Sequence, residues 1–368
     1  MDAGRLSSAR PSQAVILAGG QGTRLRPLTL ARAKPVVPLL NRPFLAYQVA
    51  MLQQHGIEDI VLSCSYRVED IRTAMAEAMP AAHIRYTVEA QPLGTGGGVR
   101  YAVNQEHGFV WVLNGDVLTD ADLTGMRRFH EAHRSRVTLL LTRVDDPRQY
   151  GLVETDADGR IRAFREKPAP GEPIPTDTVN AGIYLLDAEL LRRIPAGRPV
   201  SIEREFFPAL IADGIPCFAW CPTAYWRDIG NPEAYRAAQM DLLEGRVRTP
   251  LVPPGRARSA GVWVAEGAEL ADGASLRGPA VIAEDVRIAA GARVGPYAVL
   301  GRGCRIGAGA HVREAVLWER VEVGAEAEVA RCVVGAGARI GARAALGAGT
   351  VVDAGAVVTD QARLGVLD

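Results

Sequence analysis

A repeat of six residues runs through the last third of this chain and limits its fold more than any other feature. From Val264 to Val312 an aliphatic residue stands at every sixth position, and after slips near Trp318 and Arg331 the period resumes and runs to Val358. An α-helix repeats its faces every 3.6 residues and an ordinary strand every two, so neither has this period. The repeat predicts short strands stacked coil upon coil, each burying its aliphatic residue against its neighbours.

The first 245 residues follow a different pattern, in which short β-rich apolar runs alternate with amphipathic stretches. This pattern is typical of βαβ units and predicts a Rossmann-like α/β domain with a mixed, mostly parallel sheet. The expected strands are 14–18, 59–64, 84–88, 109–113 and 137–142. The expected helices are 43–54, 68–78, 122–134 and a last one with Asn231 as N-cap, Pro232 in its first turn and Gly245 after its end. Functional residues are then expected at the carboxyl ends of the strands.

A proline-rich segment, Thr249-Pro-Leu-Val-Pro-Pro-Gly255, separates the two patterns. It cannot continue a helix and indicates a linker. We therefore expect an α/β domain over residues 14–245, a linker over 246–257 and the repeat domain over 258–368.

Charge and composition exclude several classes of protein. The 42 Lys and Arg balance the 42 Asp and Glu, so neither a nucleic-acid partner nor a membrane surface is expected. The longest apolar runs are too short to span a bilayer, and the first 13 residues lack the apolar core of a signal peptide. A cytoplasmic location is expected. The five cysteines are scattered along the chain, and we interpret all of them as reduced thiols.

The first strand leads into a glycine-rich loop, Gly19-Gly-Gln-Gly-Thr-Arg-Leu-Arg26. Glycines after a strand let backbone N–H groups approach an anion closely, and arginines add charge-assisted contacts. The loop lacks the Gly-Lys-Ser/Thr ending of a P-loop. It also has Leu25 where the dinucleotide pattern needs a third glycine. A nucleotide phosphate is the expected ligand, and a tight structural turn is the alternative.

This loop, followed by Lys34-Pro35 and Asn41-Arg-Pro43, resembles the signature of the sugar-nucleotide pyrophosphorylases. One position departs from the family, because Ala33 stands where members usually have proline. Six further segments agree with the family in order, and they are Glu89-Ala-Gln-Pro-Leu-Gly-Thr-Gly-Gly97, Asn114-Gly-Asp116, Tyr150-Gly-Leu-Val153, Phe164-Arg-Glu-Lys-Pro168, Asn180-Ala-Gly-Ile-Tyr184 and Trp226-Arg-Asp-Ile-Gly230. The six-residue repeat resembles that of left-handed parallel β-helices.

The resemblance implies a sugar-1-phosphate nucleotidyltransferase that uses a nucleoside triphosphate and Mg²⁺. It assigns the metal to Asp116 and Asp228, since carboxylate oxygens suit Mg²⁺. Taken alone, the first would be a turn former and the second an ordinary hydrogen-bond acceptor.

Further roles follow from the same resemblance. The catalytic cations would be Arg24, Lys34 and Lys167, the first two facing the triphosphate and the third the sugar phosphate. The nucleotide would be bound by Leu17, Gly19, Gly20, Gly22, Thr23, Arg24, Glu89, Gln91 and Gly94. The sugar phosphate would be bound by Gly151, Glu166, Lys167 and Asn180.

The order of catalytic domain, linker and β-helix resembles mannose-1-phosphate guanylyltransferases, as does the segment Pro199-Val-Ser-Ile-Glu-Arg-Glu-Phe-Phe-Pro208. Thymidylyl-, uridylyl-, adenylyl- or guanylyltransferases for glucose or heptose 1-phosphate share most of these motifs and stay open as alternatives. A non-catalytic subunit that binds nucleotide sugars is an alternative of another class. A third is an acetyltransferase β-helix, for which His311 would be the histidine.

Two expectations concern residues outside this set. The row His130, Glu131 and His133 falls on an expected surface helix and is interpreted as solvated rather than metal-binding. The coil stack has open strand ends and flat faces, so we expect a homo-oligomer, a dimer or tetramer, formed through the β-helix.

Overall fold

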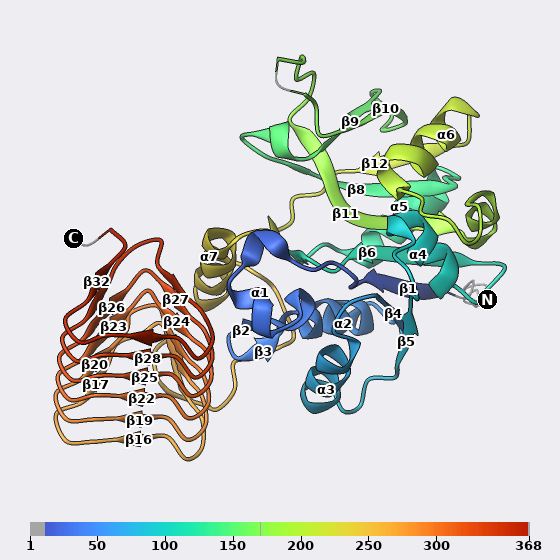
Figure 1. Cartoon of the computed structure of the whole chain (residues 1–368). Helices are drawn as coiled ribbons and strands as arrows, with labels where there is room; N and C mark the ends of the chain where they lie inside the picture. Colours follow the sequence, from blue (N-terminus) through green and yellow to red (C-terminus); the bar gives the residue numbers. More distant parts are fainter. Residues whose placement is uncertain (1–11, 170, 367–368) are drawn as a thin grey trace, which may run out of the picture. The chain divides into compact units, whose positions relative to one another are not determined.

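The structure is a computed structural model that describes residues 12–169 and 171–366 (Figure 1). Most of the segment expected to lack a signal-peptide core, residues 1–11, lies outside these ranges. The chain divides into two compact units. The sheet unit contains the chain up to Gly20 and residues 48–68 and 81–226. The β-helix unit contains residues 21–47, 69–80 and 227 onward.

A nine-stranded mixed sheet forms the centre of the sheet unit. Its strands are β1 (Ser12–Leu17), β4 (Asp59–Cys64), β5 (Ile84–Val88), β6 (Phe109–Asn114), β8 (Val137–Arg143), β9 (Gly151–Thr155), β10 (Ile161–Glu166), β11 (Thr178–Asp187) and β12 (Cys217–Trp220). The main order is β10-β9-β11-β6-β1-β4-β5, with β8 paired to β11 and to β12. This arrangement confirms the expected mixed sheet.

Parallel and antiparallel pairs occupy different parts of this sheet. β1 is parallel to β4 and β6, and β5 is parallel to β4. β11 is antiparallel to β6 and β8, and β9 is antiparallel to β10. Because β11 runs against β6, its first residues lie beside the carboxyl end of β6. The same sheet edge therefore collects the ends of the parallel strands and the beginning of β11.

Helices and turns connect the strands of the sheet unit. They are α2 (Phe44–Gln54), α3 (Val68–Ala78), α4 (Gly94–Ala102), α5 (Leu123–Ala132), α6 (Phe207–Ala212), the 3-10 turns η3 (Pro147–Gln149) and η4 (Ala188–Arg193) and the π-helical turn η5 (Ile202–Phe206). The first four residues of α2 and all of α3 after Val68 are assigned to the β-helix unit. Two short strands, β7 (Val117–Thr119) and β13 (Trp226–Asp228), complete the region. The core packs aliphatic side chains of the central strands, such as Val15, Val61 and Val112, together with α4 and α6. Burial on both faces explains why these strands are continuously apolar in sequence.

The β-helix unit begins with short elements around the second part of the glycine-rich loop. They are η1 (Thr23–Leu25), α1 (Leu28–Ala31), η2 (Lys34–Val36), β2 (Pro38–Leu39) and β3 (Arg42–Pro43). The helix α7 (Pro232–Leu243) belongs to the same unit. Its start is as expected from the sequence, because the side chain of Asn231 accepts a hydrogen bond from the Ala234 N–H at 2.8 Å.

Three sheets of short strands build the β-helix. The first sheet contains β14 (Arg256–Ser259), β15 (Val262–Val264), β18 (Ala280–Ile282), β21 (Ala298–Leu300), β24 (Val316–Leu317), β27 (Val333–Val334) and β30 (Val351–Val352). The second contains β16 (Glu269–Leu270), β19 (Arg287–Ile288), β22 (Arg305–Ile306), β25 (Glu322–Val323), β28 (Arg339–Ile340) and β31 (Val357–Val358). The third contains β17 (Ser275–Leu276), β20 (Arg293–Val294), β23 (His311–Arg313), β26 (Glu328–Ala330), β29 (Ala345–Leu346) and β32 (Arg363–Leu364).

The register of the coils explains the two slips in the repeat. Ile282 pairs with Leu300, eighteen residues later. Leu300 pairs with Leu317, and Leu317 with Val334, each only seventeen residues later. Two coils are therefore one residue short. In the first of them Leu317 takes the buried aliphatic position, and the neighbouring Trp318 is left to pack elsewhere.

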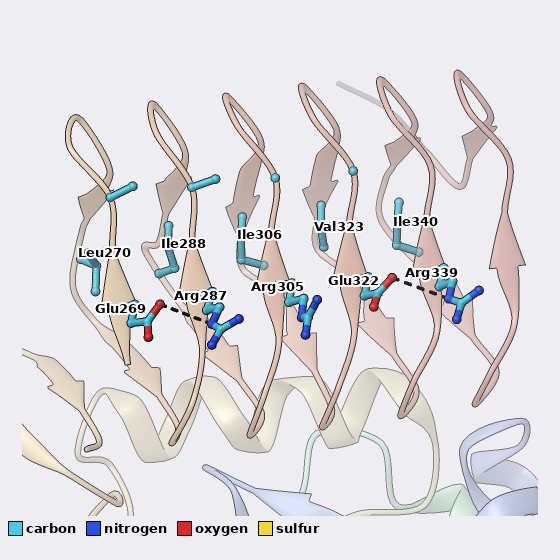
Figure 2. Close-up of a pocket in the computed structure, with 14 residues that line it drawn as sticks. Glu269, Leu270, Arg287, Ile288, Arg305, Ile306, Glu322, Val323, Arg339 and Ile340 are labelled. Carbon is cyan, nitrogen blue, oxygen red and sulfur yellow. Dashed lines mark ion pairs between the residues drawn. The ribbon is translucent and has the colours of Figure 1, made fainter. Parts of the chain in front are cut away.

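The second sheet carries a row of charged side chains beside its row of aliphatic ones (Figure 2). The charged row pairs Glu269 with Arg287 at 3.3 Å and Glu322 with Arg339 at 3.6 Å. These side chains are about half exposed or more, so each pair adds little to stability. The aliphatic row is the main stabilising feature, since a fully buried side chain of this kind contributes about 1.5–3 kcal/mol.

Candidate active site

The first part of the glycine-rich loop leaves β1 at Leu17 and is held by the end of β4. The Ala18 N–H donates to the Ser63 carbonyl at 2.8 Å, and the Ser65 hydroxyl donates to the Gly19 carbonyl at 2.8 Å. A Cβ at Gly19 would lie 2.6 Å from the Ser65 oxygen, so this position requires glycine. Gly20 is exposed, and a Cβ there would meet no atom within 4 Å. The backbone at Gly20 is open to a ligand.

Asp116 lies in the turn between β6 and β7. The turn is fixed by the Gly115 N–H, which donates to the Leu17 carbonyl at 3.0 Å, and a Cβ on Gly115 would lie 2.4 Å from that oxygen. The buried amide of Gln48 donates to the carbonyls of Asn114 and Val117 at 2.8 and 2.9 Å. Our sequence interpretation did not include Gln48, because nothing in its helical context indicates that it would bracket this turn.

The expected base-reading loop after β5 is organised by Glu89. Its two carboxylate oxygens accept hydrogen bonds from the Ser63 hydroxyl at 3.0 Å and from the Leu93 N–H at 2.8 Å. Gly94 has a φ of 69°, and a Cβ there would lie 2.6 Å from the Val200 carbonyl. Gln91 is exposed. Glu89 thus shapes the loop, whereas Gln91 extends from it.

The expected sugar-binding residues come together at the edge where β9, β10 and β11 meet. Gly151 pairs with Glu166 across β9 and β10, and a Cβ on Gly151 would lie 2.6 Å from the Glu166 carboxylate. The Asn180 amide donates to the Tyr184 hydroxyl at 2.7 Å. Lys167 lies at a φ of 50°, with its ammonium 3.8 Å from the Glu166 carboxylate and its side chain 55% exposed.

A second carboxylate in this region, Glu203 in the π-helical turn η5, was missed at the sequence level. It accepts hydrogen bonds from the hydroxyls of Thr95 at 2.8 Å, Ser201 at 3.2 Å and Tyr184 at 3.4 Å. Burial, followed by the charge of Glu203, raises the pKa of Glu166, and Lys167 partly opposes this shift. A π-helical turn is a frequent marker of functional sites, but a sequence does not display it. The signal available in the sequence was the family resemblance of the segment 199–208, which contains Glu203.

The second part of the glycine-rich loop belongs to the β-helix unit. Gly22 has a φ of 64°, and a Cβ there would lie 2.8 Å from the Cβ of Lys34. The Thr29 hydroxyl donates to the Gly22 carbonyl at 2.7 Å. Thr23 follows at the start of η1 and is exposed. The stem of Lys34, which is only 8% exposed, is thereby packed against the loop.

The residue before Lys34 departs from the family pattern without changing the path of the chain. Ala33 has a φ of −62° and a ψ of 136°. Proline fixes φ near −65°, so alanine here adopts the conformation that proline would impose.

Arg24 and Asp228 approach each other within the β-helix unit. One guanidinium nitrogen of Arg24 lies 3.9 Å from the carboxylate of Asp228. The Arg24 side chain is 62% exposed and that of Asp228 is 19% exposed. A Cβ on Gly230 would approach both groups, at 3.2 Å from the Arg24 guanidinium carbon and 2.9 Å from the Asp228 carboxylate. The glycine of the Trp-Arg-Asp-Ile-Gly segment therefore leaves room for this pair.

The two residues expected to bind the metal are of a chemical type that suits magnesium. Both expected ligands, Asp116 and Asp228, are carboxylates. Within residues 12–169 and 171–366, no group of three or more His, Cys, Asp or Glu is arranged to hold a metal. Mg²⁺ binds through one or two carboxylates together with substrate phosphates rather than in a closed protein cage, so these side chains suit it.

The cysteines and His130 were not expected to belong to the active site, and the environment of His130 differs from the expectation. All five cysteines are free in the structure. His130 is not solvated as expected. It is 1% exposed, and its Nδ1 lies 2.9 Å from the Thr138 hydroxyl. The helix α5 is amphipathic, and His130 lies on its buried face. The hydroxyl of Thr138 on the neighbouring strand provides a hydrogen-bond partner for the buried imidazole.

The groove on the β-helix gives no support to acyl transfer. It has a volume of about 670 Å³, and its lining consists of Glu, Arg, Gly, Ala and aliphatic residues (Figure 2). His311 belongs to β23, on a different sheet. The lining of the groove therefore does not include the histidine considered for acyl transfer.

Comparisons with known proteins agree with this geometry. A family model described as "Nucleotidyl transferase" matches residues 13–245, and one described as "EIF2B subunit epsilon LbH domain" matches residues 259–364. This chain belongs to the nucleotidyl transferase family. The comparisons confirm the expected enzyme class, a nucleotidyltransferase. They also confirm the expected fold, an α/β domain followed by a left-handed β-helix.

Individual relatives of this nucleotidyl transferase span both parts of the chain. The mannose-1-phosphate guanylyltransferase of Mycobacterium tuberculosis is 40% identical over 286 residues, which are 73% of this chain and 79% of the relative. The probable mannose-1-phosphate guanylyltransferase 2 of Arabidopsis thaliana is 37% identical over 281 residues, 73% of this chain and 76% of the relative. The crystal structure of HddC from Yersinia pseudotuberculosis matches with a TM-score of 0.53 and 30% identity, over 62% of this chain and 99% of that one.

The helices of this nucleotidyl transferase do not resemble membrane spans. Across the part of the chain that the structure describes, none has the length and apolar character needed to cross a bilayer.

Proposed function

We propose that this nucleotidyl transferase makes GDP-mannose and pyrophosphate from GTP and mannose 1-phosphate. The observation that supports this substrate pair is the set of relatives named for it, which are 37–40% identical to this chain. The two quoted alignments extend over 286 and 281 residues and are therefore longer than the segment matched by the catalytic family model.

In the proposed reaction a phosphate oxygen of mannose 1-phosphate attacks the α-phosphorus of GTP. A new phosphorus–oxygen bond forms, the bond from the α-phosphorus to the bridging oxygen breaks, and pyrophosphate leaves with that oxygen. The attacking phosphate is already an anion, so no general base is needed. The protein must hold two polyanions in line and neutralise the charge that develops between them.

The residues of the two units divide this task. Gly19, Gly20 and Gly22 would present backbone N–H groups to the triphosphate. Arg24 and Lys34 would neutralise the charge on its phosphates, and an arginine suits this role because its planar group binds two phosphate oxygens at once. Lys167, whose side chain is 55% exposed, would hold the phosphate of the sugar.

The sugar itself would bind beside β9, β10 and β11. Gly151 leaves space against Glu166, and Glu166 and Asn180 offer acceptors and a donor to sugar hydroxyls. Leu17, Thr23, Glu89, Gln91 and Gly94 complete the proposed nucleotide site. Gln91 is exposed and would be available to the base, and Glu89 supports the loop that carries it.

Asp116 and Asp228 would hold a magnesium ion. When bound, Mg²⁺ supplies positive charge that favours phosphoryl transfer between two anions. Asp116 is suited to this role because Gln48 and Leu17 fix the backbone on both sides of it.

We also propose the division expected from the sequence, with a catalytic domain over 14–245, a linker over 246–257 and a β-helix over 258–368. The family models match similar ranges. A homo-oligomer, a dimer or tetramer formed through the β-helix, and a cytoplasmic location complete the proposal. The free state of all five cysteines is compatible with a reducing compartment.

The test is a matrix of five nucleoside triphosphates (GTP, ATP, UTP, dTTP and CTP) against the 1-phosphates of mannose, glucose and a heptose. Pyrophosphate release gives kcat/KM for each pair, and mass spectrometry identifies the nucleotide sugar. We expect GTP with mannose 1-phosphate to give the highest kcat/KM. A different pair with a kcat/KM at least about tenfold higher would replace the proposed substrates, since that ratio corresponds to about 1.4 kcal/mol of transition-state discrimination. Nucleotide-sugar binding without turnover for any pair would favour the non-catalytic alternative.

A further inference from the structure

The segment that carries Lys34 is fixed by contacts from residues far away in the sequence. Residues 33–37 and 39–40 are buried, yet the segment contains only a 3-10 turn and two strands of two residues each. Such short elements do not position a side chain on their own, since they close few backbone hydrogen bonds. The contacts that hold this segment come from α7 and from the β-helix, both in the same compact unit.

The displaced Trp318 of the shortened coil makes the first of these contacts. It is 2% exposed, and its indole N–H donates to the Tyr235 hydroxyl of α7 at 3.0 Å. That hydroxyl in turn donates to the Pro38 carbonyl, four residues beyond Lys34. Burial raises the pKa of Tyr235, so the phenol keeps its proton for this bond. A hydrogen-bond chain therefore links the β-helix to the backbone just after η2.

The neighbouring residue of the same coil makes the second contact. Glu319 forms an ion pair with Arg32, two residues before Lys34. The guanidinium of Arg32 also lies over the Trp318 ring, 4.9 Å from its centroid. The two side chains of the pair are 28% and 22% exposed, so water screens this pair less than it screens the charged row on the second sheet.

Three further hydrogen bonds fix the hairpin after η2. The Gln239 side chain of α7 donates to the Pro38 carbonyl at 2.7 Å and accepts from the Leu40 N–H at 2.8 Å. The Asn41 amide donates to the carbonyl of Leu300, on the coil before Trp318, at 2.9 Å. Two successive coils and one helix thus hold the segment on both sides of Lys34.

The position of Lys34 also affects the glycine-rich loop. The lysine stem packs against Gly22, where a Cβ would lie 2.8 Å from the Lys34 Cβ. Gly22 precedes η1, which carries Arg24. A shift of the segment would therefore move both Lys34 and Arg24.

We propose that Glu319 and Trp318 are positioning residues for nucleotidyl transfer, which act from the β-helix on Lys34 through Arg32, Tyr235 and Pro38. This proposal rests on the role of Lys34 in nucleotide binding given above. It makes the β-helix part of the apparatus that holds the triphosphate, in addition to any role in assembly.

The test compares two glutamates of the β-helix in the full-length enzyme. Glu319→Gln removes the charge that pairs with Arg32. Glu322→Gln is the matched control, because Glu322 pairs with Arg339 within the β-helix. We expect Glu319→Gln to lower kcat/KM for the nucleotide roughly tenfold with the KM for sugar 1-phosphate unchanged, since a shift of about 1 Å at a reacting centre can cost on the order of 100-fold. Glu322→Gln should match the wild type.

Two further variants keep this test decisive. Tyr235→Phe removes the hydroxyl between Trp318 and Pro38 and should affect the nucleotide parameters in the same direction. Lys34→Ala tests the proposed function separately, because unchanged nucleotide kinetics in this variant would remove Lys34 from the site. If Lys34→Ala impairs nucleotide use but Glu319→Gln and Tyr235→Phe change only thermal stability, or impair both substrates equally, the positioning role is wrong.

Discussion

The two compact units position their site residues by different means. In the sheet unit, Asp116, Glu166 and Asn180 lie at or next to the ends of hydrogen-bonded strands. In the β-helix unit, Arg24 and Lys34 lie on single 3-10 turns. A strand end inherits its place from the ladder behind it, whereas a turn needs contacts from elsewhere. Long-range side-chain contacts accordingly hold the second group. In the first group Asp116 also receives them, because it lies in a turn that Gln48 brackets.

The two units also differ in charge. The sheet unit brings the carboxylates of Glu166 and Glu203 together beside the proposed sugar pocket. The negative charge of Glu203 raises the pKa of Glu166 there. The β-helix unit brings Arg24 and Lys34 next to the glycine-rich loop. Sugar hydroxyls are recognised by acceptors and polyphosphates by cations. Glu166 and Glu203 therefore suit the hydroxyls of the proposed sugar, and Arg24 and Lys34 suit the phosphates of the proposed triphosphate.

The largest expected effect tests whether Asp116 and Asp228 are metal ligands. Asp116→Asn and Asp228→Asn should each lower kcat roughly 100-fold or more, because each removes a negative ligand from the charge-stabilising site without opening a cavity. Pyrophosphate release at several Mg²⁺ concentrations gives the effect, and thermal unfolding checks the fold.

Exposed aspartates of the same units provide the controls, namely Asp145→Asn for the sheet unit and Asp272→Asn for the β-helix unit. Both should retain wild-type kinetics. Near-wild-type turnover in either Asp116→Asn or Asp228→Asn at saturating Mg²⁺ would take that residue out of the metal site.

A smaller effect should separate the two substrates. Arg24→Ala should lower kcat and Lys167→Ala should raise the KM for sugar 1-phosphate, each by about 10- to 100-fold, the range that corresponds to losing a hydrogen bond to a charged group. Initial rates with each substrate varied in turn measure both parameters. If Lys167→Ala changed only the nucleotide KM, Lys167 would belong to the nucleotide site and not to the sugar-phosphate site.

The regular elements and the β-helix were accessible from the sequence because each has a strong local signal. The strands 59–64 and 84–88 and the helix 68–78 have the expected bounds. The slips in the repeat correctly marked the two shortened coils. Family motifs placed Gly151, Glu166 and Asn180 in one group, and the structure brings them together.

Residues whose roles depend on tertiary contacts were not accessible in this way. Gln48 and Glu203 belong to helical segments with no local sign that they would bracket a turn or close a hydroxyl network. The expectation that His130 is solvated was wrong for the same reason, because the burial of this side chain depends on the neighbouring strand. The expected boundary after Gly245 also gave no indication that residues 21–47 would cluster with the β-helix rather than with β1.

Two glycines of the glycine-rich loop allow the two units to be compared directly, since Gly20 belongs to the sheet unit and Gly22 to the β-helix unit. Gly22→Ala should destabilise the protein by about 1–2 kcal/mol, because a Cβ at positive φ is strained and would also meet Lys34. Gly20→Ala should leave the melting temperature unchanged, since a Cβ there meets no protein atom within 4 Å. It should nevertheless raise the nucleotide KM if phosphate approaches this backbone. Equal melting temperatures with an unaltered nucleotide KM for Gly20→Ala would place the phosphate elsewhere.

The smallest expected effect concerns the pH dependence of the sugar pocket. Burial and Glu203 raise the pKa of Glu166, while Lys167 and Arg204 lower it less. As pH falls, Glu166 should therefore lose its charge earlier than an ordinary glutamate. The KM for sugar 1-phosphate should rise on this acid limb by about two- to tenfold, the range for one net hydrogen bond. The phosphate of the substrate also titrates, at about pH 6. The measurement is therefore the ratio of the KM values of the wild type and Glu166→Gln at each pH.

Stability should show the same shift with a definite sign. A raised pKa means that the Glu166 contribution to stability is fully present below its unfolded-state pKa and is lost as pH rises through its folded-state pKa. Glu166→Gln should thus melt higher than the wild type near neutral pH, and the gain should vanish in acid. Glu205→Gln is the control of opposite sign, because hydrogen bonds from the Ser201 N–H and Arg198 lower the pKa of Glu205. Its loss of stability should be present near neutral pH and disappear as pH falls through the folded-state pKa. If the melting temperature of Glu166→Gln followed the wild type at every pH, the raised pKa of Glu166 and the acid limb attributed to it would both be wrong.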